Sequence, residues 1–293
     1  MHIVFMNGGL GNQLFQYMFY RCYRKLLPHT DIVIDDGKFW GDDVPHHGYE
    51  LQRIFGLELP LLSQRFTPDV WQYMVKMRQQ GVDIPEQLRI SGLPLKVIRE
   101  KGITNINFNG EVEDLPVGAS MDVNKNENIY WHGYWLTNSF YSQATVEIKE
   151  DLRFPDFNDE LNLKLQEKIN RASEPTAIHI RRGDMAKMGW SAPSEYYQKM
   201  ISYFDANYNV SQYFLFSDDI SWCEEHADEL GLVNIADRLL VVDNNQNENY
   251  WRDLQLMSLC KNRITDRSSF SLLAGLLCSY PQKQDINRWG VSI

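Results

Sequence analysis

Two adjacent arginines follow a short apolar run in the sequence AIHIRRGD, residues 177–184. Because side chains alternate along a strand, His179 and Arg181 would share one face, with Asp184 close behind them. Guanidinium groups bind phosphate oxygens through paired hydrogen bonds. We therefore predict an anion site around Arg181 and Arg182. The alternative is a surface loop in which these arginines pair with acidic neighbours.

A second candidate is the sequence GGLGNQ, residues 8–13, between an apolar run and a longer amphipathic segment. Glycines allow a positive φ and a close approach of the backbone to a ligand. The start of a helix also attracts phosphate. Gly9 and Gly11, followed by the polar Asn12 and Gln13, favour a functional loop over a purely structural turn.

The same loop matches a dinucleotide fingerprint only in part. The third glycine of G-x-G-x-x-G is replaced by Leu14, although Asp35 and Asp36 follow at a suitable separation for binding a ribose. No Gly-Lys-Ser/Thr sequence is present here, so a P-loop is not indicated. A nicotinamide-dependent oxidoreductase therefore stays only as a third alternative.

Two further strand ends carry polar side chains. Asp218 and Asp219 follow the apolar run YFLF, where they could bind a divalent metal or cap the next helix. Ser268 and Ser269 open an apolar helix, which is the sequence form of an anion site or of a simple N-cap. Asp253 stands at another helix start, where capping is the alternative to ligand binding.

Alternating strands and helices must position these side chains. HIVFM and DIVID predict strands around a helix from about Gln13 to Leu27, and the aromatic NIYWHGYWLT, residues 128–137, predicts another strand. The segment SFYSQATVEIKEDLRF predicts one long helix after it. From Pro175 onward, short strands are separated by helices of about 10–14 residues, which indicates parallel βαβ units. We predict two α/β domains, 1–155 and 156–293, with a cleft between them.

Bulk properties restrict the function. The 293-residue chain has a net charge of −10, which argues against a nucleic-acid-binding protein. Its four cysteines have no C-x-x-C spacing, which suits reduced thiols and gives no zinc framework. No run approaches the ~20 apolar residues that span a bilayer. We expect a bacterial-type protein, cytoplasmic or peripheral to the inner membrane, with no cofactor and no nucleic-acid partner; its oligomeric state stays open.

Four segments, in this order and at these separations, resemble the α1,2-fucosyltransferase family, glycosyltransferase family 11. They are GGLGNQLFQYMF at 8–19, HIRRGD at 179–184, YFLFSDDISWC at 213–223 and DLQLMSLCKNRITDRSSFSLLAG at 253–275. The resemblance spans nearly the whole chain. It implies the GT-B architecture of two Rossmann-like domains, GDP-fucose as donor, no metal, and inverting transfer to the 2-hydroxyl of a terminal β-galactose.

The resemblance also assigns residues. It implies that Arg181 holds the β-phosphate, that His179 and Asp253 meet the guanine and ribose, and that the serines at 268–269 face the pyrophosphate. The 156–293 domain would then bind GDP-fucose, while 1–155 would serve mainly the acceptor. The predicted donor-binding residues are Gly9, Gly11, Asn12, Gln13, His179, Arg181, Arg182, Asp218, Asp253, Ser268, Ser269 and Phe270.

The last motif departs from the family pattern, which is close to IIANSSFSWWGAWL. Leu272 and Leu273 replace two tryptophans, and Asp266 and Arg267 precede the serines. The departure leaves open a change in acceptor choice or in the precision of donor binding. It also leaves open a catalytically silent GDP-sugar-binding protein, while the shared arginine motif leaves open an α1,6 or α1,3 linkage.

The chemistry needs a leaving-group stabiliser and a base. Arg181 is the predicted stabiliser. Asp184 is the first candidate for the base and Glu195 the second, although Asp184 could instead orient an arginine. For the acceptor, an aromatic band could stack on sugar faces or could simply pack the core. Its predicted contact residues are Trp131, Tyr134 and Trp135.

Overall fold

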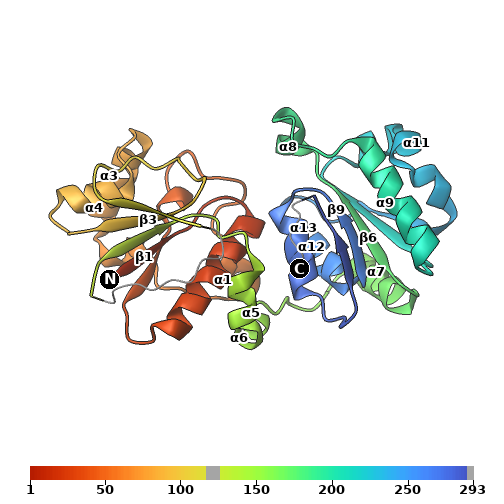
Figure 1. Cartoon of the computed structure of the whole chain (residues 1–293), viewed down its shortest axis with the longest axis horizontal. Helices are drawn as coiled ribbons and strands as arrows, with labels where there is room; N and C mark the ends of the chain where they lie inside the picture. The colour runs from red at the N-terminus through yellow and green to blue at the C-terminus, as the bar shows by residue number, and fades with distance from the viewer. Residues whose placement is uncertain (117–125, 289–293) are drawn as a thin grey trace. The chain divides into compact units, whose positions relative to one another are not determined.

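The computed structural model describes residues 1–116 and 126–288. The chain divides into two compact units, Met1–Pro155 and Asp156–Ile293, each built around a five-stranded sheet (Figure 1). The predicted α/β class is confirmed. The acceptor and donor roles of the two units, and a cleft between them, stay predictions.

The N-terminal unit contains a parallel sheet in the order β2-β1-β5-β3-β4. Its strands are β1 (His2–Phe5), β2 (Ile32–Asp35), β3 (Lys96–Glu100), β4 (Val112–Leu115) and β5 (Ile129–His132). Its helices are α1 (Leu10–Leu26), α2 (Leu51–Phe55), α3 (Pro68–Gln79), α4 (Ile84–Ile90), α5 (Asn138–Gln143) and α6 (Thr145–Asp151), with 3₁₀ turns η1 (Gly37–Phe39) and η2 (Leu62–Arg65).

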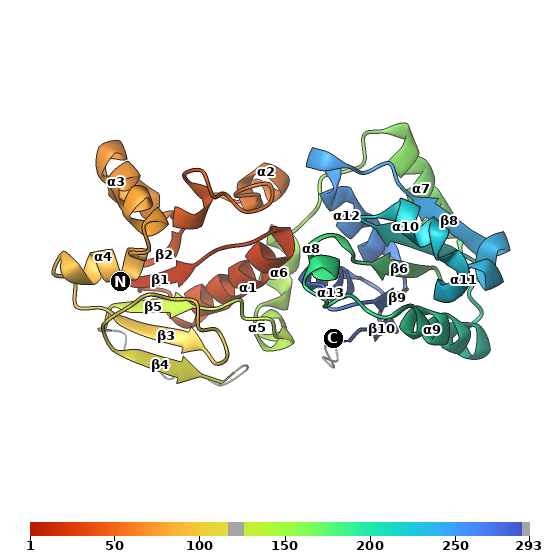
Figure 2. The ribbon, with the colours of Figure 1, turned by 90° about the horizontal axis from the view of Figure 1, so that it is seen from above.

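Helices cover both faces of this sheet (Figures 1 and 2). On one face, Ile3, Phe5 and Val97 pack against Trp71 of α3 and Leu88 of α4 in one apolar cluster. On the other face, α1 contributes a long run of buried residues. Because both faces are covered, β1 and β2 are buried at every position and contain almost only apolar residues.

The C-terminal unit contains a second parallel sheet, in the order β10-β9-β6-β7-β8. Its strands are β6 (Thr176–Ile180), β7 (Tyr213–Ser217), β8 (Leu239–Val242), β9 (Asn262–Thr265) and β10 (Gln284–Ile286). Its helices are α7 (Glu160–Arg171), α8 (Gly183–Lys187), α9 (Ser194–Asn207), α10 (Ile220–Glu225), α11 (Ala227–Leu230), α12 (Trp251–Leu259) and α13 (Ser269–Leu277), with 3₁₀ turns η3 (Leu232–Arg238) and η4 (Asn247–Asn249).

The alternation predicted for β6 is present. Ile178 and Ile180 join the apolar cluster under α9, together with Leu215 of β7. His179, between these two isoleucines in the sequence, points to the opposite face of the sheet. Its ring centroid lies 6.0 Å from that of Phe270 in α13. The strand therefore presents His179 on the side where α13 begins.

Several predicted elements are shorter than expected. The aromatic strand ends at His132, because the buried carboxylate of Glu100 accepts the N–H groups of Tyr134 and Trp135 at 2.7 and 2.8 Å. Trp135 there has a positive φ of 56°. The long helix predicted after it is divided into α5 and α6 at Ala144.

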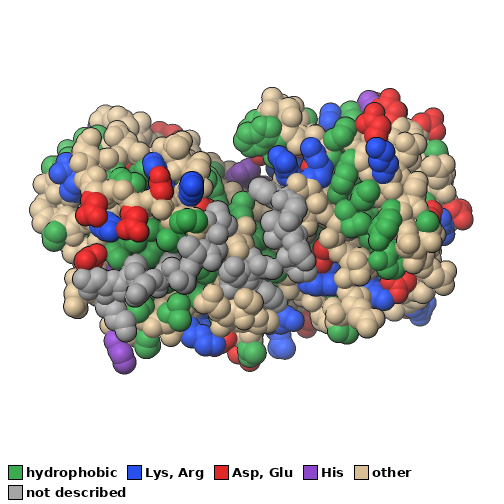
Figure 3. Space-filling model, viewed as in Figure 1, with side chains coloured by type: hydrophobic (Ala, Val, Ile, Leu, Met, Phe, Trp, Pro, Cys, Tyr) green, Lys and Arg blue, Asp and Glu red, His purple; other side chains and the backbone are tan. Residues whose placement is uncertain are grey.

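The surface carries mixed charge. Figure 3 shows acidic and basic side chains interspersed with neutral ones on the face drawn, over both units. In the described part of the chain, no helix has the length and apolar character needed to cross a membrane.

Candidate functional site

The arginine loop, defined here as residues 181–184, begins where β6 ends. Arg181 forms ion pairs with Asp184 at 2.8 Å and with Asp218 of the β7–α10 loop at 2.7 Å. Its side chain keeps 29% of its surface exposed. Parallel strands end at one edge of the sheet, so β6, β7 and β9 bring their following loops together there. The guanidinium is thus held in place at this edge and is open to solvent.

Asp218 and Asp219 have different roles. Asp218 accepts the N–H of Arg182 at 2.7 Å in addition to its ion pair with Arg181. A Cβ at Gly183 would lie 2.5 Å from the Asp218 carboxylate, so a glycine is needed for this close approach. Asp219 caps α10 by accepting the N–H of Trp222 at 3.2 Å. Of the two alternatives for Asp219, helix capping is therefore present.

The two adjacent arginines diverge. The guanidinium of Arg182 lies 3.7 Å from the ring centroid of Trp222, which is stacked on His226. A cation–π contact of this kind stabilises by roughly 0.5–2 kcal/mol. Arg181 and Arg182 therefore do not form one guanidinium cluster in this structure, and Arg181 is the better placed for an anion.

His179 is a buried neutral group on the α13 side of the sheet. It is 5% exposed, and its Nδ1 has no hydrogen-bond partner among the described residues. Burial, aided by the charge of Arg181, lowers the pKa of His179 to about 3. The imidazole is therefore uncharged near pH 7 and has an unused nitrogen, as a ligand-binding group requires.

Aromatic and acidic groups extend this region onto α12 and α13. Phe270 stacks on Tyr250 with ring centroids 5.7 Å apart. Asp253 of α12 accepts a 2.8 Å hydrogen bond from Asn245. Burial raises the pKa of Asp253 to about 7. His179 and Phe270 are thus in ring contact, and Asp253 lies one helical turn after Tyr250 on the same helix start.

The start of α13 is a candidate anion site. Ser268 is the N-cap residue, but its side chain makes no capping hydrogen bond. The first N–H groups of a helix have no intrahelical partner, and the helix dipole places partial positive charge there. The N–H of Ser268 already donates to the carbonyl of Asp266 at 2.9 Å, so this helix start offers the Ser268 hydroxyl and the positive end of the helix dipole at the sheet edge where Arg181 lies.

Asp266 is a positioning residue that the sequence analysis identified only as a departure from the family pattern. It is fully buried and accepts the N–H groups of Ala192 at 2.5 Å and Arg267 at 2.6 Å. Arg288 pairs with it at 3.1 Å. Asp266 therefore ties the loop before α9 to the loop before α13. Leu272 and Leu273, the other departures, are buried on α13.

The two base candidates differ in environment. Asp184 is already engaged, because its Oδ1 accepts Arg181 at 2.8 Å and the N–H of Met185 at 3.0 Å. This geometry is the predicted alternative in which Asp184 orients an arginine. Glu195 is exposed in the first turn of α9. The role of either as base stays a prediction.

The glycine loop in the N-terminal unit is held by buried amides. Gln13 is fully buried; its amide nitrogen donates to the carbonyls of Gly8 at 2.9 Å and Gly48 at 2.8 Å, and its oxygen accepts Glu50 N–H at 3.0 Å. In this structure Gln13 therefore cannot touch a bound sugar nucleotide directly, contrary to the prediction. It positions the loop, because every polar atom of its amide is occupied within the protein.

Backbone geometry shapes the same loop. Gly8 has a φ of +86°, and a Cβ there would meet Asn12 Nδ2 at 2.5 Å. α1 begins at Leu10, three residues earlier than predicted, so Gly11 and Asn12 belong to its first turn. Gly9 is the N-cap residue of α1. The loop thus resembles an anion-binding helix start, and its contact with a donor stays a prediction.

The aromatic band belongs mainly to the core. Trp131 and Trp135 are 0% and 1% exposed, and Trp135 stacks on Phe19 with centroids 4.3 Å apart. The prediction that these two indoles contact an acceptor is therefore wrong for this structure, because no ring face reaches solvent. Tyr134 is partly exposed and stays a candidate.

The chain has two parallel sheets covered by helices, with an arginine at the carboxyl edge of the second, and this is a GT-B-like glycosyltransferase fold. The model of "Glycosyl transferase family 11" matches residues 117–281. The chain belongs to this family and is a glycosyltransferase.

Similar sequences agree with this family. An alpha-1,2-colitosyltransferase of Escherichia coli is 25% identical over 93% of this chain and 86% of its own length. The O-antigen biosynthesis glycosyltransferase WbnK of Escherichia coli is 27% identical over 95% of this chain and 90% of its own. A galactoside alpha-(1,2)-fucosyltransferase 2 of Pongo pygmaeus is 26% identical over 50% of this chain and 44% of its own.

A solved structure supports the fold. The crystal structure of NodZ alpha-1,6-fucosyltransferase soaked with GDP-fucose aligns with a TM-score of 0.51, at 13% identity, over 94% of this chain and 91% of that one. At this identity the likeness concerns the fold alone.

Proposed function

We propose that this protein transfers L-fucose from GDP-fucose to the 2-hydroxyl of a terminal β-galactose, with inversion at the anomeric carbon. One observation carries the proposal: in a family 11 chain, Arg181 lies at the carboxyl edge of the second sheet, directly after β6, whose neighbour β9 leads into the start of α13. Arginine and a helix N-terminus together suit a diphosphate. The α1,2 linkage is supported by the names of the colitosyl and fucosyl relatives.

In this mechanism, charge develops on the GDP leaving group as the glycosidic bond breaks. Arg181 and the positive end of the α13 dipole stabilise that charge, and fixed groups of this kind are commonly the largest contribution to catalysis. Asp218 orients the guanidinium of Arg181. The acceptor hydroxyl loses its proton to a carboxylate, for which Asp184 is our first candidate. The proposal requires no metal and no cofactor.

A colitosyl donor is the second candidate, because one of the relatives is an alpha-1,2-colitosyltransferase. The two donors are distinguished by supplying GDP-fucose and GDP-colitose separately to the purified protein, with lactose as acceptor. We expect faster turnover of GDP-fucose. Turnover of GDP-colitose alone would replace the fucosyl assignment.

The main test is product analysis. GDP-fucose and a panel of β-galactosides, with and without EDTA, should give fucose linked to the galactose 2-hydroxyl, identified by NMR and mass spectrometry. Fucose on a 6-hydroxyl or 3-hydroxyl would overturn the linkage. Loss of activity with EDTA would overturn the metal-free mechanism. GDP binding without turnover on any acceptor would indicate a silent GDP-sugar-binding protein.

A further inference from the structure

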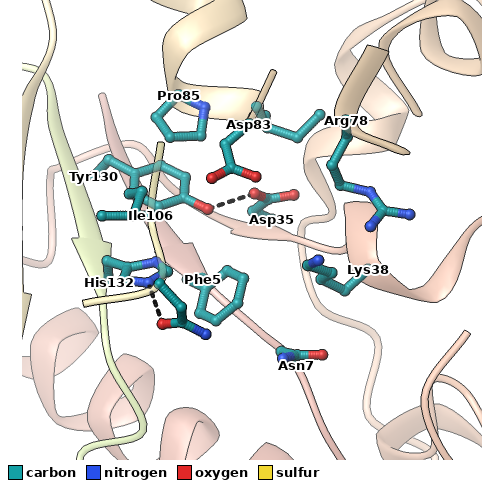
Figure 4. Close-up of a pocket in the computed structure, with 12 residues that line it drawn as sticks. Phe5, Asn7, Asp35, Lys38, Arg78, Asp83, Pro85, Ile106, Tyr130 and His132 are labelled. Atoms are coloured by element: carbon teal, nitrogen blue, oxygen red, sulfur yellow. Dashed lines mark hydrogen bonds between the residues drawn. The ribbon is translucent and has the colours of Figure 1, made fainter. Parts of the chain in front are cut away.

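Asp35 and Asp253 are both aspartates whose pKa is raised by burial, to about 6 and about 7, but they differ in their hydrogen bonds. Asp35 is satisfied within its own unit: one oxygen accepts the hydroxyl of Tyr130 at 2.6 Å and the other accepts the N–H of Gly37 at 2.9 Å (Figure 4). Asp253 Oδ1 accepts the amide of Asn245 at 2.8 Å, and its Oδ2 accepts no hydrogen bond from the described residues. Asp253 is also partly exposed. Its carboxylate is therefore available to a ligand, whereas that of Asp35 is not.

The amide of Asn245 is held by a second amide, that of Asn162 at the start of α7. Asn245 Nδ2 donates to Asn162 Oδ1 at 3.0 Å, and Asn162 Nδ2 donates to Asn245 Oδ1 at 2.8 Å, so the two side chains form a reciprocal pair. Both residues are buried. Asn162 Nδ2 also donates to Asp159 at 2.9 Å. The structure thus contains a row of carboxylate, amide, amide and carboxylate that runs from Asp159 to Asp253.

The two carboxylates fix which way each amide points. An ionised carboxylate can only accept hydrogen bonds. The second N–H of Asn162 donates to Asp159, and the second N–H of Asn245 donates to the other carboxylate, Asp253. Turning either amide over would place its oxygen against a carboxylate. Asn244 donates to both amide oxygens, at 3.3 and 3.2 Å, so every polar atom of the pair is occupied and its orientation is fixed.

A fixed amide donor has two effects on Asp253. It holds the carboxyl group in one orientation, and it favours the ionised form, because a hydrogen bond to a carboxylate opposes the effect of burial. Each oxygen of an ionised carboxylate has about two acceptor positions. Asn245 uses one of them, which leaves acceptors on both oxygens of Asp253. Two such acceptors match the adjacent N1–H and 2-amino donors of a guanine base.

Other charged groups act on Asp253 less directly. Arg252, its neighbour on α12, donates instead to the carbonyl of Asp156 at 3.1 Å and to the amide of Gln255 at 2.7 Å. The helix α13, which packs against α12, contains no ionisable side chain, and His179 is neutral near pH 7. The other charged side chains of α7 and of the loop before α12 are exposed: Glu160, Lys164, Glu167, Lys168, Arg171, Asp243 and Glu248.

We propose that Asn245, held by Asn162, is a positioning residue that keeps the carboxylate of Asp253 oriented and ionised for the N–H donors of the guanine base. The inference rests on the proposed function, since it takes the donor to be a guanine nucleotide. A purely structural tie between α7 and the loop before α12 would need only the amide pair. The hydrogen bond onward to a carboxylate with an unused oxygen is what points to a ligand.

The test compares Asn245→Ala with Asn262→Ala in the full chain, with GDP as the probe. Asn262 is the matched control, because it is a fully buried asparagine at the start of β9, at the opposite end of the strand from the carboxyl edge, and donates to Glu174 at 3.0 Å. Loss of the hydrogen bond from Asn245 should raise the pKa of Asp253 by about one unit. The ionised fraction then falls about fivefold at pH 7 and hardly changes at pH 9.

Calorimetric titration should therefore show that Asn245→Ala binds GDP about fivefold more weakly than wild type at pH 7 and within about twofold of wild type at pH 9. All the proteins meet the same ionisation state of GDP at each pH, so the ratio reports the protein alone. Asn262→Ala should bind GDP as wild type does at both pH values, even where it is less stable. No loss for Asn245→Ala, or a loss of equal size at pH 7 and pH 9, would overturn the inference.

A second variant covers the case in which Asn245→Ala does not fold. Asn162→Ala releases Asn245 from its other side, while the N–H of residue 162 can still donate to Asp159, as it does at 2.8 Å in the native chain. It should give the same pattern with pH and a smaller loss of affinity. Wild-type affinity at pH 7 for this variant would show that the amide pair does not act on Asp253.

A ligand-free measurement separates this inference from the proposed function. The ¹³C NMR signal of the Asp253 carboxyl carbon, assigned by its absence in Asp253→Asn, should titrate near pH 7 in wild type and Asn262→Ala, and about one unit higher in Asn245→Ala. An unchanged midpoint in Asn245→Ala means that the inference is wrong. If the midpoint moves as expected but the folded wild type does not bind GDP, the control of Asp253 by Asn245 stands. The proposed function then fails, and the guanine part of this inference fails with it.

Discussion

The glycine loop and the arginine loop each follow the first strand of a five-stranded parallel sheet, β1 and β6, but different side chains hold them in place. Amide side chains fix the glycine loop: besides Gln13, Gln16 accepts the N–H of Asn7 and donates to the carbonyl of Gly133, both at 3.0 Å. Carboxylates fix the arginine loop through Asp184 and Asp218. The first set of contacts is buried, and the second is open to solvent.

This difference has an energetic consequence. Exposed ion pairs stabilise by roughly 0–1 kcal/mol, so Arg181 can exchange a carboxylate for a phosphate at small cost. Leaving a buried amide partner unsatisfied costs roughly 1–3 kcal/mol, so the glycine loop cannot rearrange as easily. We infer that the arginine loop adapts to the donor, while the glycine loop is a preformed surface.

The largest effect on catalysis is expected from replacing Arg181. For Arg181→Ala we expect kcat/KM for GDP-fucose to fall about 10²–10³-fold, because a fixed donor to the leaving group is lost. The free energy of unfolding should change little, since only exposed ion pairs disappear. Steady-state kinetics and denaturant unfolding measure both quantities.

Arg171→Ala is the matched control, because Arg171 pairs with Glu167 on the exposed surface of α7. Its kinetics should equal those of the wild type. A change of less than threefold for Arg181→Ala would mean that Arg181 serves only the loop, and the proposed donor site would be wrong.

Replacing Gln13 should instead lower the stability of the fold. Gln13→Ala leaves the carbonyls of Gly8 and Gly48 and the N–H of Glu50 without their partner. The free energy of unfolding should fall by about 2–3 kcal/mol. Gln52→Ala, at an exposed position on α2, should leave it unchanged within about 0.5 kcal/mol. A Gln13→Ala protein as stable as wild type would show that the glycine loop is not fixed by its amides.

Sequence patterns predicted the sheets well, because a parallel strand buried on both faces reads as a short apolar run. TAIHI and YFLF are such runs, and each forms a strand. The end of the aromatic strand at His132 could not be predicted, because it depends on Glu100, which lies more than 30 residues earlier and captures two backbone N–H groups.

The candidate site was predictable where the chemistry is local to one loop. The motif HIRRGD identified Arg181. That Arg182 points elsewhere depends on its contact with Trp222 of α10, which the motif does not contain. The burial of Gln13 depends on Gly48 and Glu50, far along the chain. Spacing shows which side chains can meet a ligand, whereas competition from other segments decides which do.

Donor binding should depend on pH through Asp253. Burial raises the pKa of Asp253 to about 7, whereas His179, with a pKa of about 3, stays neutral throughout. Only ionised Asp253 can accept hydrogen bonds from both donors of a guanine edge. Affinity for GDP-fucose should therefore fall about tenfold from pH 8 to pH 6, as the ionised fraction falls. Calorimetric titration across this range measures it.

Asp253→Asn provides the control for this dependence. The variant should bind GDP-fucose weakly, with an affinity that varies less than twofold between pH 6 and pH 8. A wild-type affinity that is flat over the same range would contradict the assignment of Asp253 to the guanine side.

The smallest effect is expected at Arg182, the neighbour of Arg181. Because its guanidinium lies on the ring of Trp222, Arg182→Leu should lower the free energy of unfolding by about 0.5–1 kcal/mol. The KM of GDP-fucose should rise less than threefold, far below the effect of Arg181→Ala. Trp222→Leu removes the same contact from the other side and should lower stability by a similar amount. If Arg182→Leu instead matches Arg181→Ala in kinetics, Arg182 leaves Trp222 for the donor on binding, and the arginine loop rearranges further than its ion pairs imply.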